Sequence, residues 1–366
     1  MTRAQTARAL IKGNATVDGT RAFRKQFARL RSEKFYRPLA SGPFVSSLGL
    51  GTYLGECDDA EDARYTGAAI AAIERGVNLL DTAINYRCQR SERALGAALQ
   101  KIIGATIKRE HVVVCTKGGY VPLDKNPPAT REDYRSFLDE EYFLRGIMDP
   151  ADIVAGGHCL TAKFLEDQIE RSRTNLGVET IDVYYLHNPE QALDALPRER
   201  FLPLIRDAFA ALERAVDAGL IGCYGCATWN GLRVAPDARN HLSIEELVSL
   251  AREAAGGDHH FAVVQCPINL AMTEAVRMQT QSVGRDRVSV LEAAHRLGVS
   301  VIASATLMQS QLTRGLPAQV HSTFPGFNTD ARRAIAFTQS LPVSSALVGM
   351  KSVAHLEENL AAPSAA

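Results

Sequence analysis

The sequence predicts a (β/α)8 TIM barrel, and three observations support this prediction. Short β-branched runs alternate with segments of helical period along the chain. Eight such pairs follow one another in a single stretch, whereas a doubly wound sheet uses fewer strands. No G-x-G-x-x-G follows the first apolar run, as a doubly wound dinucleotide-binding fold would require. We therefore expect a closed barrel with a long insertion after strand 3 and a basic N-terminal extension.

The eight predicted strands are short and are bounded by turn residues, as buried parallel strands are. They are placed at 44–50, 77–81, 112–117, 181–187, 221–228, 261–265, 299–304 and 345–349. Amphipathic helices are expected at 60–75, 90–107, 165–176, 198–218, 244–255, 288–297, 330–339 and 353–360. In the third of these, Leu165, Ile169 and Leu176 form the apolar stripe and Gly177 is suited to the helix C-terminus.

Composition excludes several classes of protein. The chain has 41 Lys+Arg and 41 Asp+Glu, so its formal net charge is zero. It lacks the excess of basic residues that would predict a nucleic-acid partner. No apolar run approaches the roughly 20 residues of a membrane helix. Seven cysteines, an odd number in a large chain, do not indicate a disulfide framework. We expect a cytoplasmic protein without nucleic-acid or membrane partners, and the composition leaves its oligomeric state open.

The first 38 residues form the one segment of biased charge. Residues 1–38 hold ten Lys and Arg against two acidic residues, and no apolar stretch of a secretory signal follows. Phe23, Phe27 and Leu30 would share one helical face, which suits a short helix packed on the body, with a transit peptide as the alternative. We expect 39–366 to form a single barrel domain.

Two segments are longer than ordinary loops. They cover 118–160 after the third predicted strand and 269–287 after the sixth. Both leave the C-terminal ends of strands, the face on which barrel enzymes build their sites, so we expect them to determine substrate specificity. The alternative is an insertion that only decorates the barrel or contacts another subunit.

Reactive side chains stand at the C-terminal ends of three neighbouring predicted strands. Asp81 ends the second strand, Lys117 the third and His187 the fourth, and Tyr86 follows Asp81 by a short step. A phenol with a pKa near 10 is a weak acid, and a nearby ammonium lowers that pKa. A carboxylate keeps the lysine charged, and an imidazole donates to a developing alkoxide. Such a group of residues protonates a carbonyl oxygen while a reduced nicotinamide provides the electrons.

At these residues the sequence resembles the aldo-keto reductase superfamily. The segments that carry the resemblance are Gly76–Ala83 with Tyr86, Glu92 and Gly96, the strand of Lys117, Asp182–His187, Leu48–Thr52, Val264–Gln265, Val348–Gly349 and Glu358–Asn359. They occur in family order between about Leu39 and Leu360. The resemblance implies that Asp81, Tyr86, Lys117 and His187 form the catalytic tetrad.

The same resemblance implies a nicotinamide cofactor. Gln265 would bind the carboxamide, Glu358 and Asn359 would contact adenine, and no metal site is expected. The other cofactor-binding positions would be Gly51, Thr52, Asp81, Leu307 and Gly349. Lys351, at the start of the last helix, is suited to a 2′-phosphate and favours NADP(H), although an ordinary surface lysine fits the same position.

The sequence departs from the family pattern at two cofactor positions. Ala227 and Thr228 stand where the family usually has Ser-Asn, and Ser304 replaces the aromatic residue that stacks on nicotinamide. We expect Trp229, or Tyr120 from the insertion, to pack the nicotinamide ring instead. Trp229 could also be a wall of the substrate pocket, for which Tyr53 and Asn188 are further candidates.

These interpretations predict an NADP(H)-dependent reductase of an aldehyde, ketone or sugar carbonyl, or the reverse dehydrogenase. A nicotinamide-binding regulatory or assembly protein and a redox-neutral epimerase stay open. Cys57 and Cys88 follow the first two strands and are equally suited to line the pocket or to fill space. His158 could reach the site from the insertion, but we expect it to be solvent-exposed, as loop histidines more often are. The two thiols of Cys223-x-x-Cys226 are expected on opposite faces of a strand.

Overall fold

The computed structural model describes residues 9–104 and 106–361, and its centre is a closed barrel of eight parallel strands. The strands are β3 (Leu48–Gly51), β4 (Leu79–Asp81), β5 (Val113–Gly118), β6 (Ile181–His187), β7 (Ile221–Ala227), β8 (Phe261–Pro267), β11 (Ser300–Ser304) and β12 (Ser345–Gly349). The barrel closes where β12 pairs with β3, with Ala346 opposite Leu48. The predicted fold class is confirmed.

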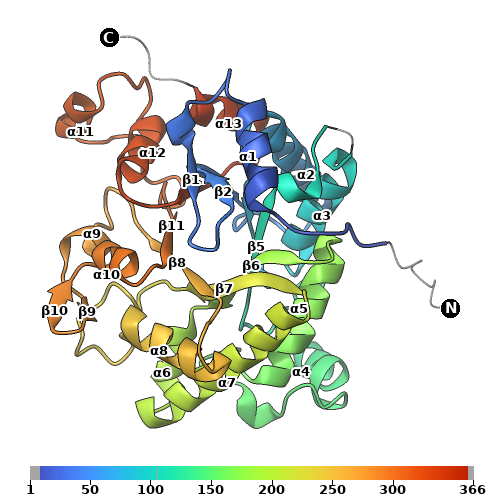
Figure 1. Ribbon diagram of the computed structural model, residues 1–366. Coiled ribbons are helices and arrows are strands. Elements are labelled where there is room, and N and C mark those ends of the chain that lie inside the picture. The colour runs from blue at the N-terminus through green and yellow to red at the C-terminus, as the bar shows by residue number, and fades with distance from the viewer. Residues whose placement is uncertain (1–8, 105, 362–366) are drawn as a thin grey trace.

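Eight helices alternate with these strands and surround them (Figure 1). They are α2 (Asp59–Glu74), α3 (Arg90–Ile102), α5 (Ala162–Leu176), α7 (Arg198–Asp217), α8 (Ile244–Ala255), α10 (Val290–Arg296), α12 (Asp330–Ser340) and α13 (Val353–Leu360). The apolar helix faces pack on the outside of the strands, and a second apolar cluster fills the barrel. Cys226 belongs to the outer cluster and Cys223 to the inner one, so the two thiols do face opposite sides of β7.

Several predicted boundaries were wrong, and three of them have a clear structural reason. The run at 44–50 is two strands, because β2 (Phe44–Ser46) pairs with β1 (Tyr36–Pro38) in an antiparallel hairpin before β3 enters the barrel. The helix expected at 90–107 ends at Ile102, where Ile103 is extended. The helix expected at 288–297 begins at Val290, because β10 (Asp286–Val288) forms a hairpin with β9 (Gln281–Val283).

The N-terminal segment contains the expected short helix, α1 (Val17–Gln26). Phe23 and Phe27 are buried, but Leu30 lies beyond the helix and is 65% exposed, so it does not share their face. The backbone N–H of Ala15 donates to Asp182 Oδ1 at 2.6 Å, which anchors the segment to the start of β6. Residues 1–8 of the predicted basic extension, like the final residues 362–366, lie outside the described residues.

The long insertion has secondary structure of its own. It contains α4 (Arg131–Leu138), a π-helical turn (Asp139–Phe143) and a 3-10 turn (Pro150–Asp152). Leu138, Tyr142, Met148 and Cys159 form a small apolar cluster with Phe164 of α5. The insertion is therefore packed against the barrel through a core of its own.

The remaining short helices connect these elements. They are the 3-10 turns Glu33–Phe35, Arg109–His111 and Pro189–Gln191, with α6 (Ala192–Ala195), α9 (Glu274–Arg277) and α11 (Ala318–Thr323).

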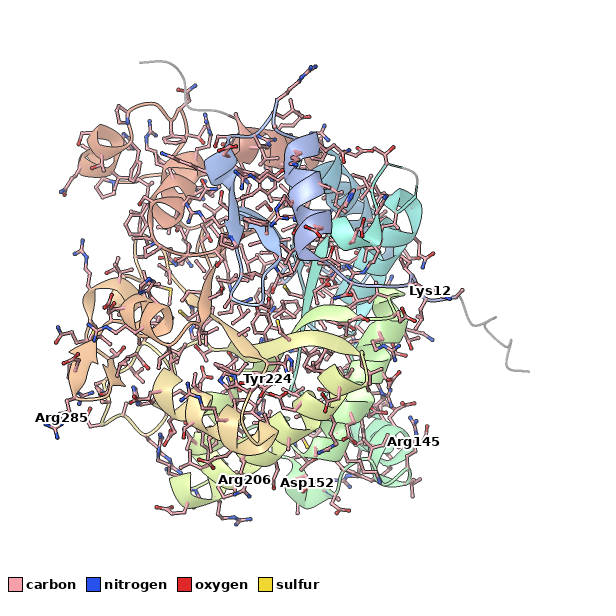
Figure 2. All side chains as sticks on the ribbon, in the orientation of Figure 1. Lys12, Arg145, Asp152, Arg206, Tyr224 and Arg285 are labelled. Carbon is pink, nitrogen blue, oxygen red and sulfur yellow. The ribbon has the colours of Figure 1, made fainter. Side chains whose placement is uncertain are left out.

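Figure 2 shows Tyr224 within the body of the molecule, whereas Arg145, Arg206 and Arg285 point outward at its edge. Within the described part of the chain, every helix is too short or too polar to cross a membrane.

Candidate functional site

A cavity of about 580 Å³ lies at the C-terminal ends of the barrel strands. This is the end at which enzymes with this fold place their reactive groups. The sequence-predicted residues that line it are Gly51, Thr52, Tyr53, Asp81, Tyr86, His187, Asn188, Trp229, Gln265, Leu307 and Gly349. The fold therefore brings together residues that are far apart in the sequence.

The base of the cavity holds a buried ion pair. Lys117 Nζ lies 2.5 Å from Asp81 Oδ1 and also donates to the carbonyl oxygen of Thr82 at 2.7 Å. Gln265 Nε2 donates to the other oxygen of the Asp81 carboxylate at 2.9 Å. Burial by itself lowers the pKa of Lys117, but the Asp81 carboxylate more than offsets this, and the pKa is raised. The ammonium is therefore charged although it is only 1% exposed.

Tyr86 lies directly beside this pair. Lys117 Nζ is 5.2 Å from the centroid of the Tyr86 ring, and the rings of Tyr53 and Tyr86 meet edge to face at 5.0 Å. Lys117 lowers the pKa of Tyr86, as expected, but it does not determine the direction of the net shift. Burial raises that pKa, and the ammonium offsets only part of the rise. The phenol is thus protonated at neutral pH, as a proton donor must be.

His187 lies on the other side of Tyr86. Its ring meets the Tyr86 ring edge to face at a centroid distance of 5.7 Å. Burial, and then the charge of Lys117, lower the pKa of His187 well below its usual value. The imidazole is therefore neutral at pH 7 and can donate one hydrogen bond without bringing a second positive charge. The structure places all four residues of the predicted tetrad within one group.

The insertion reaches this group through His158 and Tyr120. His158 is fully buried, so the expectation that it is solvent-exposed was wrong. Its Nε2 lies 2.7 Å from the carbonyl oxygen of His187, and because a carbonyl only accepts, His158 is the donor. Tyr120 packs between the two histidines, with its ring centroid 4.9 Å from each. One end of the insertion therefore packs against His187 and hydrogen-bonds its backbone.

A polar wall lies next to Tyr120. Asn188 Nδ2 donates to the Tyr120 hydroxyl at 2.9 Å, and that hydroxyl donates to Gln191 Oε1 at 2.7 Å. Asn188 has a φ of 48°, a left-handed conformation that turns the chain sharply at the end of β6. Asp194 and Asn240 complete this polar side of the cavity.

The loop after β7 is fixed by a buried carboxylate. Glu190 Oε1 accepts the backbone N–H groups of Trp229, Asn230 and Gly231 at 2.7, 3.0 and 3.3 Å. Burial raises the pKa of Glu190, and these three donors counteract the rise. The result is a rigid platform for Trp229, whose side chain lines the cavity and is 45% exposed.

Several buried polar atoms at the cavity have no partner among the described residues. They include Asn85 Oδ1, Thr228 Oγ1 and Thr306 Oγ1, all from residues that line the cavity. Buried polar atoms are normally hydrogen-bonded, and unpaired ones are costly. Because all three residues line the cavity, these unpaired atoms indicate that it is suited to a polar ligand.

Three predicted cofactor residues lie outside the cavity lining. Glu358 and Asn359 are partly exposed on α13, and Lys351 precedes that helix. The Lys351 ammonium donates to Glu61, a buried carboxylate in the first turn of α2 that also accepts from Arg64 at 3.0 Å. Lys351 is therefore already paired with an acidic side chain, which the sequence did not indicate.

The second long segment, 269–287, contributes nothing to the described cavity lining, so the expectation that it determines specificity finds no support in the geometry. It packs instead against the loop that follows β7. Gln281 Nε2 donates to the carbonyl oxygens of Leu232 and Leu242 at 3.0 Å, and Glu274 pairs with Arg233 at 2.8 Å. Its role in the structure is to brace that loop from outside.

Sequence reasoning missed part of the lining. The additional residues are Leu54, Asn85, Glu190, Gln191, Asp194, Asn230, Asn240, Ala305, Thr306, Met308, Gln309, Ser310 and Leu347. Most of them follow strand C-terminal ends, and that position was a usable signal. The turn at Met308–Ser310 has φ values of 46°, 52° and 70°, a left-handed run of non-glycine residues that the sequence does not reveal.

Comparisons with known proteins agree with this geometry. A D-threo-aldose 1-dehydrogenase from Pseudomonas sp is 32% identical over 188 residues, which cover 51% of this chain and 51% of that protein. An aldo-keto reductase family 1 member C23-like protein from Equus caballus is 25% identical over 202 residues, 52% of this chain and 50% of that protein. The chain spans about half the length of these relatives.

Solved structures show the same fold. An aldo/keto reductase from Klebsiella pneumoniae, in complex with NADP and acetate, has a TM-score of 0.58 at 19% identity, covering 89% of this chain and 88% of that one. A glycerol dehydrogenase from Gluconobacter oxydans has a TM-score of 0.58 at 20% identity, covering 91% and 92%. A model of the Aldo/keto reductase family matches residues 47–324, most of the barrel. The chain belongs to the aldo/keto reductase family.

Proposed function

We propose that this protein is an NADP(H)-dependent oxidoreductase that reduces the carbonyl group of an aldehyde, ketone or sugar, or oxidises the matching alcohol. One observation supports this most strongly. The buried Asp81–Lys117 pair lies beside a protonated Tyr86, with the neutral His187 across from it, at one end of a polar cavity.

Each member of this group has a distinct task in the proposed reaction. Tyr86 donates its phenolic proton to the carbonyl oxygen as negative charge develops there. Lys117 stabilises the resulting phenolate, and Asp81 holds the ammonium in place and keeps it charged. The neutral His187 hydrogen-bonds the same oxygen and orients the substrate. A bound reduced nicotinamide supplies the hydride.

The residues present fit a nicotinamide cofactor. The unpaired Thr228 Oγ1 and Thr306 Oγ1, together with the Gln265 amide, offer polar partners on one side of the cavity. Gly51 and Gly349 line the adjacent edge, where the absence of side chains allows a flat ligand to approach the backbone. We assign NADP(H) through Lys351, which would have to exchange its Glu61 partner for the 2′-phosphate.

The polar wall favours a sugar over an apolar carbonyl compound. The cavity lining includes the amide and carboxylate residues Asn188, Gln191, Asp194, Asn230 and Asn240, and the aromatic residues Tyr53 and Trp229. Amides and carboxylates suit the hydroxyl groups of a polyol, and aromatic rings pack on the apolar face of a sugar. The Pseudomonas relative is named for an aldose, which agrees with this substrate class.

The test is oxidation of NADPH and NADH with a panel of aldehydes, ketones and sugars, and reduction of NADP⁺ with aldoses. In the most active pair, Tyr86→Phe should lower kcat by about 10²–10⁴-fold, the typical contribution of a general acid. Fluorescence titration should show unchanged cofactor affinity. Because the pKa of Tyr86 is raised, wild-type reduction should stay constant with pH until above the ordinary tyrosine value of about 10.

The same assay separates the other functions left open by the sequence. Tight cofactor binding with no turnover in the whole panel would indicate a regulatory protein. Interconversion of sugar epimers with no net cofactor oxidation would indicate an epimerase. Turnover by Tyr86→Phe near the wild-type rate would show that another group donates the proton.

A further inference from the structure

Two cysteines outside the proposed reaction lie in contact beside the cavity. Cys57 Sγ and Cys88 Sγ are 3.6 Å apart, on the loops that follow β3 and β4. Cys57 is partly exposed, whereas Cys88 and the other five cysteines are buried. Neither belongs to the cavity lining, so the two thiols do not fill the pocket role considered from the sequence.

The chain around this pair is held in an unusual conformation. Arg87, Cys88 and Gln89 have φ values of 50°, 53° and 67°, left-handed values that side chains other than glycine rarely adopt. The Arg87 guanidinium donates to the carbonyl oxygen of Glu56 at 2.7 Å and to that of Asp58 at 3.3 Å. These contacts fix the segment on both sides of Cys57 against the turn that contains Cys88.

The first part of the insertion lies against the turn that contains Cys88. The backbone N–H of Lys125 donates to the carbonyl oxygen of Cys88 at 3.0 Å, and Gln89 Nε2 donates to that of Leu123 at 3.1 Å. Three segments therefore meet at the thiol pair: the loop after β3, the turn after β4 and the first part of the insertion. Two of them supply the ring pair Tyr53 and Tyr86 to the cavity.

We propose that Cys57 and Cys88 form a reversible disulfide when the protein meets a peroxide, and that this bond ties the loop of Tyr53 to the turn of Tyr86. The two sulfurs must close from 3.6 Å to the bonded separation of about 2.0 Å. Side-chain rotation with a small loop movement achieves this, because the arginine contacts already hold the two segments together.

The chemistry balances with hydrogen peroxide as the oxidant. The Cys57 thiolate attacks one peroxide oxygen, the O–O bond breaks, and the departing hydroxide takes up a proton to form water. Cys88 sulfur then attacks the Cys57 sulfenic acid, the S–O bond breaks, and a second water leaves with the Cys88 proton. Two electrons pass from the two thiols to the peroxide. A dithiol reductant later reduces the Cys57–Cys88 disulfide with two electrons and restores both thiols.

Exposure assigns the order of the two steps. Burial, and then the hydrogen bond with Cys57, raise the pKa of Cys88 to about 12, so its thiolate is scarce at neutral pH. Cys57 is the partly exposed thiol and reacts with the peroxide first. Cys88 then resolves the sulfenic acid, because the two sulfurs are already neighbours.

The test is intact-protein mass spectrometry with thiol counting after exposure to hydrogen peroxide and its removal by catalase. We expect the mass to fall by about 2 Da, the loss of two hydrogens, and the count of free thiols to fall from seven to five. Peptide mapping should join the peptides of Cys57 and Cys88, and dithiothreitol should reverse the change. Seven remaining thiols, or a disulfide between other cysteines, would overturn the proposal.

Single variants separate the two steps. Cys88→Ser should stop at the Cys57 sulfenic acid, which dimedone traps, whereas Cys57→Ser should react at neither position. Cys159→Ser, a buried cysteine of the insertion, is the matched control and should form the disulfide as the wild type does. A dimedone adduct at Cys88 instead of Cys57 would overturn the assigned order.

The tether also has a measurable effect on motion and, through the proposed reductase function, on turnover. Amide hydrogen exchange in 52–58 and 84–90 should slow in the oxidised protein, which tests the tether without any activity assay. If the protein is the reductase proposed above, kcat should fall several-fold, because the turn of Tyr86 is pulled toward Cys57, and should recover with dithiothreitol. Unchanged exchange in a protein that carries the disulfide would refute the tether.

Discussion

The two sides of the cavity differ in how firmly the structure fixes their side chains. On the side proposed to be catalytic, Lys117 Nζ lies 2.5 Å from Asp81 Oδ1, and both side chains are buried. The buried His187 Nδ1 on this side has no partner among the described residues. On the side assigned to the cofactor, Thr228 and Thr306 keep unpaired hydroxyls, and Lys351 is paired with Glu61. The Asp81–Lys117 pair satisfies itself within the protein, whereas the hydroxyls of Thr228 and Thr306 have no partner among the described residues.

This difference has a physical basis. A catalytic group must be held near its reactive geometry throughout the reaction, and preorganised polar groups avoid reorganisation at that moment. A site that binds and releases a cofactor instead needs groups that exchange partners. The predictions below test whether the two sides really differ in this way, beginning with the largest expected effect.

The largest effect should come from breaking the buried ion pair. Lys117→Met leaves the Asp81 carboxylate buried without its partner, which typically destabilises a protein by about 3–5 kcal/mol. Asp81→Asn combined with Lys117→Met should recover much of the free energy of unfolding but none of the activity. Urea unfolding measures the first quantity and NADPH oxidation the second.

The matched control is Lys12→Met, an exposed lysine of the N-terminal segment, which should leave both quantities unchanged. Wild-type stability in Lys117→Met would mean that the pair contributes nothing to the fold. Recovered activity in the double variant would show that the reaction does not need the preorganised ion pair. The proposed difference between the two sides of the cavity would then be wrong.

His158 should make the catalytic side sensitive to acid. Burial lowers its pKa to about 4, against about 6.5 in an unfolded chain. Between these values the unfolded state binds more protons, so stability is full above about pH 6.5 and declines as the pH falls toward 4. The depression of the His158 pKa corresponds to at most about 3–4 kcal/mol of stability. Urea unfolding between pH 7 and 4 measures the decline.

His158→Gln tests this contribution directly. A glutamine amide can still donate to the carbonyl oxygen of His187, but it does not titrate, so the decline should shrink by the share assigned to His158. His355→Gln, an exposed histidine at the start of α13, should keep the wild-type profile. An identical decline in His158→Gln and wild type would assign the acid sensitivity to other groups.

On the side assigned to the cofactor, breaking an ion pair should change cofactor affinity instead of the stability of the fold. Glu61 and Lys351 form the ion pair that competes with a 2′-phosphate. Glu61→Gln should free the ammonium and shift the ratio of NADPH to NADH affinity roughly tenfold toward NADPH, a share of the ~1.5–3 kcal/mol of a charge-assisted hydrogen bond. Lys351→Ala should shift the ratio the other way. Fluorescence titration with both cofactors measures it.

Arg64→Ala is the matched control, because it removes the other partner of Glu61 and leaves Lys351 in place. A ratio that neither Glu61→Gln nor Lys351→Ala changes would make Lys351 an ordinary surface residue. Equal affinity of the wild type for both cofactors, with a rise in Glu61→Gln alone, would show that Glu61 fully neutralises the lysine.

The same contrast explains what the sequence predicted and what it did not. Asp81 and His187 end apolar strands, and Lys117 is the last residue but one of its strand, so the barrel topology alone brings them to one face. The Lys351–Glu61 pair joins residues 290 positions apart on two helix entries, and no local pattern indicates it. The burial of His158 depends on how the insertion folds back, which periodicity does not show. Strand ends are local signals, whereas loop contacts depend on tertiary packing.

The smallest effect concerns the ring that packs against the nicotinamide. Ser304 lines the cavity but has no ring, and Trp229 lines the same cavity on a loop that Glu190 holds rigid. An aromatic contact contributes about 0.5–1.5 kcal/mol, so Trp229→Ala should weaken cofactor binding by about two- to tenfold. Stereospecifically deuterated NADPH should also show less selective transfer.

Tyr120→Phe is the comparison variant, because it keeps the alternative ring and removes only the hydroxyl that contacts Asn188 and Gln191. It should change the KM of a sugar substrate and leave cofactor affinity intact. Ser304→Tyr, added to Trp229→Ala, should restore tight binding if the two positions serve the same ring. If Trp229→Ala changes neither cofactor affinity nor deuterium transfer, Trp229 is a wall of the substrate pocket. The side of the cavity assigned to the cofactor would then hold the nicotinamide by hydrogen bonds, without an aromatic contact.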